Sequence, residues 1–141
     1  MDIVTIKRKL DSLQRCLQRI IDKCPETVEP LINDVDLQDV LILNLTRAVQ
    51  LSVDLAAHIL ASQRLPPPET MGQSFDRLAN AGLISPDLAL RLRKAVGFRN
   101  IAIHAYDAID WSIVHAISTR SLDDFRALAK VVQAQLHTTS M

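Results

Sequence analysis

Four side chains that can bind ligands or transfer protons occur within eight residues of the C-terminal half. They are Arg99, Asn100, His104 and Tyr106, and isoleucine and alanine separate them. RNA can be cleaved without a metal if one group removes the 2′-OH proton, another protonates the leaving 5′ oxygen, and a cation stabilises the phosphate charge. Histidine takes either protonation state near neutral pH, and arginine can bind two phosphate oxygens. The segment could therefore cleave a phosphodiester bond.

The spacing of these residues limits how a single helix could use them. Residues five apart on an ideal α-helix point about 140° from one another, so Arg99 and His104 do not converge, whereas Asn100 and His104 do. Either the helix ends or distorts between Arg99 and His104, or the same helix of a second protomer completes the site across a two-fold axis. We favour the dimer.

The segment from Arg99 to Tyr106 resembles the R-x4-H-x-Y signature of HEPN proteins, specifically the HepT-like ribonuclease toxins. The segment Leu43-Asn44-Leu45-Thr46-Arg47-Ala48 is also similar to that family. The resemblance implies a helical homodimer with a metal-independent endoribonuclease centre in the cleft at the dimer interface. It implies that Arg99 binds phosphate and stabilises the transition state, that His104 is the general acid or base, and that Asn100 orients them.

The resemblance also implies a partner and a modification. In HepT-like modules, an antitoxin of the nucleotidyltransferase type can transfer AMP from ATP to the tyrosine of the motif, which blocks the ribonuclease. This implies Tyr106 as the adenylylated residue, a cognate nucleotidyltransferase antitoxin as partner, and RNA as substrate. The chain would then be the toxin of a type VII-like toxin–antitoxin system. The alternatives are a catalytically inert helical module that partners a nucleotidyltransferase, and a purely structural dimeric bundle.

Each residue of the motif also has a purely structural alternative. His104 could be a core histidine bonded to a carbonyl group, Arg99 a surface salt-bridge residue, and Tyr106 a packing aromatic. Three basic residues one to two turns upstream could bind RNA phosphates or form a solvated face, namely Arg91, Arg93 and Lys94.

A second set of polar residues lies along the long apolar segment, at spacings of three, seven and four: Asn44, Arg47, Asp54 and His58. A solvated face is the default interpretation. Alternatively, part of this stripe lines the cleft, with Arg47 assisting phosphate binding and Asp54 pairing with His58. Four polar residues around the start of this segment suit helix capping better than cation binding, and we assign no metal site: Asn33, Asp34, Asp36 and Asp39.

Hydrophobic periodicity and capping residues predict an all-α fold. Apolar residues recur every three or four positions in the expected helices, which cover about 3–24, 37–60, 70–82, 85–106, 109–117 and 121–136. Residues 25–33 hold two prolines and no periodic pattern, so we expect a connector. Ser85-Pro86-Asp87 is typical of a helix start, and Gly82 suits the left-handed turn that ends the preceding helix. The simplest architecture is an antiparallel bundle of four to five helices.

Size and composition favour one soluble, cytoplasmic domain. The chain has 141 residues, 48% of them hydrophobic, and we expect a single domain over 1–136 with a frayed tail at 137–141. Sixteen basic and sixteen acidic residues give no net charge, so RNA binding must rely on a local patch. No signal peptide and no uninterrupted apolar run of about 20 residues is evident. Cys16 and Cys24 are too far apart along a helix, about 12 Å, to form a disulfide.

Overall fold

The computed structural model describes residues 2–140, and every regular element in this range is helical. The elements are α1 (Ile3–Lys23), α2 (Glu29–Asn33), α3 (Val35–Ser62), α4 (Met71–Asn80), α5 (Pro86–His104), the 3-10 turn η1 (Tyr106–Ala108), α6 (Trp111–Arg120) and α7 (Leu122–Ser140). The predicted all-α class is confirmed.

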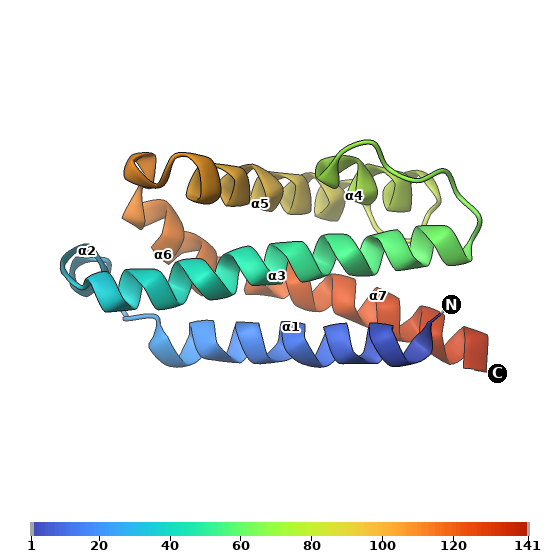
Figure 1. Ribbon diagram of the computed structural model, residues 1–141, viewed down its shortest axis with the longest axis horizontal. Coiled ribbons are helices and arrows are strands. Elements are labelled where there is room, and N and C mark those ends of the chain that lie inside the picture. Colours follow the sequence, from blue (N-terminus) through green and yellow to red (C-terminus); the bar gives the residue numbers. More distant parts are fainter. Residues whose placement is uncertain (1, 141) are drawn as a thin grey trace.

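Helix α3 lies at the centre of the bundle and contacts all of the other α-helices. In Figure 1, α1 and α5 flank α3 on opposite sides and run antiparallel to it, while α6 and α7 lie behind it. The end of α5 lies near the start of α3, so the segment after α5 can meet residues from the first turns of α3.

The helix starts follow the capping residues of the sequence. The side chains of Asp34, Thr70 and Ser85 accept hydrogen bonds from backbone N–H groups three residues further on, at the starts of α3, α4 and α5. Such a cap stabilises a helix by about 1 kcal/mol. After α4, Gly82 has a φ of 77°, which is the left-handed turn that the sequence predicts there.

The length and apolar character of α3 follow from its central position. By length and composition alone this helix could cross a membrane, and half of its most apolar stretch is buried inside the fold. The buried surface of α3 is broad, because Asn44 and Leu55 lie on one edge of it and Val49 and Leu60 on the other. A core helix that is covered from several directions needs this composition.

Two segments differ from the sequence prediction. The expected connector at 25–33 contains the one-turn helix α2, in which Pro30 occupies the first turn and Leu31 is fully buried. Proline is tolerated there because first-turn N–H groups have no partner within the helix, and five residues are too few to show a period. Helix α7 continues to Ser140, beyond the end at 136 that the sequence predicts. The frayed tail at 137–141 stays a prediction, and Met141 lies outside the described residues.

Candidate functional site

Arg99 and His104 lie on the same uninterrupted helix. Helix α5 includes both residues and ends at His104. The helix therefore neither ends nor distorts between them, and the two side chains leave it in directions about 140° apart. Of the two geometries that the sequence allows, the one that relies on a break in the helix is wrong. A single chain thus presents Arg99 and His104 on different sides of α5.

Arg99 is half-buried and makes no ion pair with any described residue. Its Nη1 donates to Oδ1 of Asn100 at 3.3 Å, and its Nε is buried with no hydrogen-bond partner in the described chain. The alternative role as a surface salt-bridge residue is therefore wrong. The guanidinium keeps its positive charge uncompensated, and the amide of Asn100 orients it.

His104 is exposed in the last turn of α5. A core histidine would be enclosed, so that alternative is wrong. Around it the helix leaves apolar surface uncovered, because Ile101 and Ile103 are each 49% exposed. The imidazole is open to a ligand in the single chain, and the exposed isoleucines supply surface that a second subunit could cover.

Tyr106 begins the 3-10 turn after α5 and contacts two other elements. Its hydroxyl donates to Oδ1 of Asp39, in the second turn of α3, at 3.2 Å. Its ring meets the edge of Trp111 with centroids 6.1 Å apart and planes at 69°. Burial, the hydrogen bond to Asp39 and the negative charge of that carboxylate raise the pKa of the phenol. Tyr106 is nevertheless 41% exposed, so the hydroxyl is neutral, oriented and accessible.

Asp39 is a site residue that the sequence did not reveal. It is 67 positions from Tyr106, and the sequence offered only a capping role for the acidic residues around the start of α3. The structure gives that role to Asp34, whose side chain accepts from the backbone N–H of Leu37. No local pattern could have connected Asp39 with Tyr106, because their contact depends on how α3 and α5 pack.

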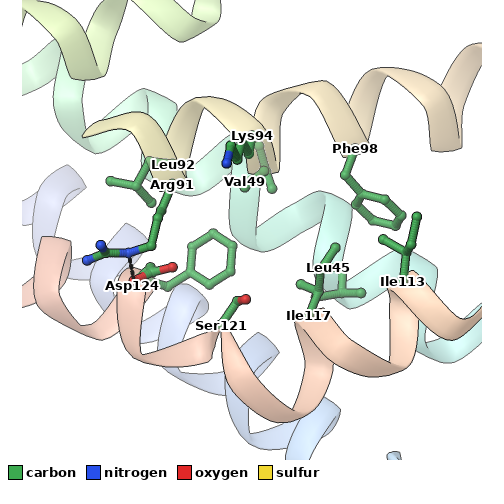
Figure 2. A pocket seen from close by; sticks show the side chains of 12 residues that line it. Leu45, Val49, Arg91, Leu92, Lys94, Phe98, Ile113, Ile117, Ser121 and Asp124 are labelled. Carbon is green, nitrogen blue, oxygen red and sulfur yellow. Dashed lines mark hydrogen bonds and ion pairs between the residues drawn. The ribbon is translucent and has the colours of Figure 1, made fainter. Parts of the chain in front are cut away.

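The three basic residues upstream of the motif extend to different neighbours. Figure 2 shows Arg91 reaching Asp124 of α7 beside an apolar pocket between α3, α5, α6 and α7. The pocket has a volume of about 280 Å³, and the Nε of Arg91 lies 2.8 Å from Oδ1 of Asp124. Lys94 lines the same pocket, whereas Arg93 pairs with Asp76 of α4 at 3.4 Å. A shared RNA-binding patch of these residues stays a prediction, and two of its three charges already face carboxylates.

The polar stripe of α3 is not one solvated face. Asn44 is buried, and its Nδ2 donates to the carbonyl of Val40. The predicted pair of Asp54 with His58 is wrong, because one oxygen of Asp54 accepts from Lys9 at 3.0 Å and the other from Gln50 at 2.9 Å. Packing of α1 against α3 brings Lys9 to this carboxylate.

Arg47, another member of the stripe, is exposed on α3 and lines a groove between α1 and α3, whereas His58 is half-buried.

Both cysteines are free thiols, and burial raises the pKa of each. Within residues 2–140, no group of three or more histidine, cysteine, aspartate or glutamate residues is arranged to hold a metal ion.

Comparison with known proteins gives one consistent family. A model of the family described as ribonuclease HepT-like matches residues 13–132. The chain is 35% identical over 130 residues to the mRNA nuclease HepT of Shewanella oneidensis. The aligned region covers 92% of this chain and 97% of that protein. The chain is 26% identical over 89 residues to the tRNA nuclease HepT of Aphanizomenon flos-aquae, covering 63% of this chain and 60% of that one.

A solved structure agrees with these relatives. The tri-AMPylated Shewanella oneidensis HEPN toxin in complex with the MNT antitoxin superposes with a TM-score of 0.88 at 35% identity, over 95% of this chain and 99% of that one. The helical bundle and the sequence thus point to the same group of proteins.

Proposed function

This chain belongs to the HepT-like ribonuclease family, and we propose that it is the endoribonuclease toxin of a toxin–antitoxin pair that acts in the cytoplasm. The observation that carries the proposal is the placement of the motif. Arg99 and Asn100 stand one turn before an exposed His104, on a regular helix whose end is open to a ligand.

The proposed reaction cleaves RNA by attack of a 2′ oxygen on the neighbouring phosphorus, and it uses no metal. A base takes the 2′-OH proton, the bond from phosphorus to the 5′ oxygen breaks, and an acid protonates that oxygen. The products are a cyclic phosphate and a free 5′-OH. His104 is the general acid or base, and such transfer is worth roughly 100- to 10,000-fold in rate. Arg99 stabilises the charge on the phosphate, with its guanidinium held by Asn100.

A homodimer would bring the two groups together. Because Arg99 and His104 diverge on α5, we propose that the catalytic centre takes them from two copies of the chain whose α5 ends meet across a two-fold axis. The exposed Ile101 and Ile103 next to His104 fit an interface at this end of the bundle.

Inhibition is proposed to act through Tyr106. The partner is a nucleotidyltransferase, as in the complex of the similar Shewanella oneidensis toxin with its antitoxin. The phenol oxygen of Tyr106 attacks the α-phosphate of ATP, pyrophosphate leaves, and the phenolic proton is released. The added AMP brings bulk and negative charge two residues from His104, where it excludes an RNA phosphate.

Expression of the chain alone tests the ribonuclease proposal. We expect wild type to arrest growth of a bacterial host and to fragment its RNA, and His104→Ala to do neither. His137→Ala is the matched control, since it removes an exposed histidine from α7, outside the motif. Purified protein is checked by mass spectrometry for AMP.

The outcomes separate the candidate functions. Unmodified wild-type protein that neither arrests growth nor cleaves RNA would leave the inert partner of a nucleotidyltransferase as the better account. Toxicity that persists in His104→Ala at equal protein level would refute the role of His104.

A further inference from the structure

A groove of about 610 Å³ lies between α1 and α3, and its charged lining is entirely basic. Arg15 and Arg19 enter it from α1 and Arg47 from α3, and no carboxylate lines it. The chain as a whole has equal numbers of acidic and basic residues, so this is a local accumulation of positive charge that composition does not reveal.

No carboxylate of the described chain neutralises the charges of the three arginines. None of them forms an ion pair with a described residue, whereas Lys9, Arg91, Arg93 and Arg126 all do. Arg15 donates only to the hydroxyl of Ser12, at 3.0 Å, which leaves its charge uncompensated. Arginines that the fold does not neutralise are available to an anionic ligand.

The electrostatics of the groove wall agree with this. Burial raises the pKa of the Cys16 thiol, and the positive charges of Arg47 and Arg15 oppose that rise. The two guanidinium groups come from different helices and act on the same atom. Their fields therefore overlap in the groove.

An exposed face of α3 runs from the groove toward the motif. Asp39, Leu43 and Arg47 are four residues apart and share one face of this helix. Asp39 holds the hydroxyl of Tyr106, while Leu43 and Arg47 line the groove. Arg47 is thus about 12 Å along α3 from the residue that contacts Tyr106. An RNA strand bound at the end of α5 can extend into the groove over a few nucleotides.

From these observations we infer that the α1–α3 groove binds the phosphate backbone of the RNA strand next to the cleavage site, through Arg15, Arg19 and Arg47. Arginine forks suit phosphate oxygens, and Arg15 and Arg19 are one turn, about 6 Å, apart along α1. This spacing lets them bind successive phosphates of an extended strand. The inference rests on the proposed ribonuclease function and extends it to substrate binding.

Binding of a labelled single-stranded RNA to full-length protein tests the inference. The measurements are made in the His104→Ala background, so that no cleavage occurs. Each of Arg15→Gln, Arg19→Gln and Arg47→Gln should weaken binding about two- to fivefold. The triple variant should weaken it at least tenfold and reduce the slope of log affinity against log salt by about 2, since each phosphate contact on a single strand contributes about 0.7.

The matched control is Arg120→Gln, which removes an exposed arginine from the end of α6, outside the groove. It should leave affinity and salt slope unchanged. If the triple variant does not fold, the single variants decide the question, because all three arginines are exposed. In the His104-containing protein, the single variants should raise KM for RNA and leave kcat unchanged.

Several results would overturn the inference. Groove variants that bind RNA as tightly as the control, with the same salt slope, would show that the strand takes another path. Loss of association with the nucleotidyltransferase, or of the dimer, with RNA affinity intact would identify the groove as a protein interface. Wild-type protein that does not cleave RNA would instead refute the proposed function.

Discussion

The geometry of α5 predicts that Arg99 and His104 act from different subunits of the proposed dimer. The two residues are five apart on a regular helix and point about 140° from one another. This can be tested by combining two inactive chains, Arg99→Ala and His104→Ala, in one dimer. Each chain then keeps the group that the other has lost.

The expected activity follows from counting sites. In a mixed dimer, one site has both an intact arginine and an intact histidine, and the other has neither. Random pairing makes about half of the dimers mixed, so an equal mixture should recover roughly one quarter of wild-type activity. Each variant alone should be reduced about 100-fold or more, because it lacks the phosphate-stabilising or the proton-transferring group in both sites.

The assay uses two affinity tags, one on each variant, in cells that express both. Sequential purification isolates the mixed dimer, which should cleave labelled RNA at about half of the wild-type rate since one of its two sites is intact. His104 is exposed, so its replacement should change the free energy of unfolding by less than about 0.5 kcal/mol. Thermal unfolding of each variant checks that activity is not lost through the fold.

A verified mixed dimer with no more activity than the separate variants would show that the two groups do not act from different subunits. Arginine and histidine of the same subunit would then cooperate, despite their divergence on α5. A protein that is monomeric and fully active at the assay concentration would show the same.

Three further predictions follow from single contacts. Asp39→Asn should lower the pKa of the Tyr106 phenol, because it removes the negative charge and weakens the hydrogen bond that help to raise it, while burial keeps part of the rise; ultraviolet titration of the phenolate measures this, and an unchanged curve would contradict it. Tyr106→Phe should keep the ring contact with Trp111, change stability by about 1 kcal/mol or less, and yield no AMP adduct by mass spectrometry after incubation with the partner and ATP. Phe125→Ala should destabilise the fold by about 3–5 kcal/mol in denaturant unfolding, since this ring is 2% exposed in the core; a cost below 1 kcal/mol would disprove that packing role.

The capped helix starts and the apolar stripes were predictable because they are local properties of the chain. Ser85 caps α5 through a bond to a residue three positions away, and the stripe of α1 repeats every three or four residues. Such signals lie within one or two helical turns, where a single sequence can be interpreted. Helix α2 escaped prediction for the same reason, since its five residues are shorter than the window that reveals a period.

The motif alone does not predict whether α5 is continuous from Arg99 to His104 or whether His104 is exposed. The sequence placed Arg99, Asn100 and His104 on or near one helix and left open whether that helix breaks. The structure shows that it does not, because the helix is regular up to His104. The exposure of the histidine is a further result of packing, since the residue type alone also allows a core position.

Local patterns in the chain predict the helical class, most helix starts, and the order of the chemical groups from Arg99 to Tyr106. The contacts of Asp39 with Tyr106 and of Lys9 with Asp54, and the approach of the α1 arginines to Arg47, result from the packing of the helices. Capping and periodicity are set by neighbours a few residues away, so they can be recognised in the chain. Contacts between residues tens of positions apart depend on the angle and register at which α1, α3 and α5 pack, and these are fixed by the burial of all their apolar faces together.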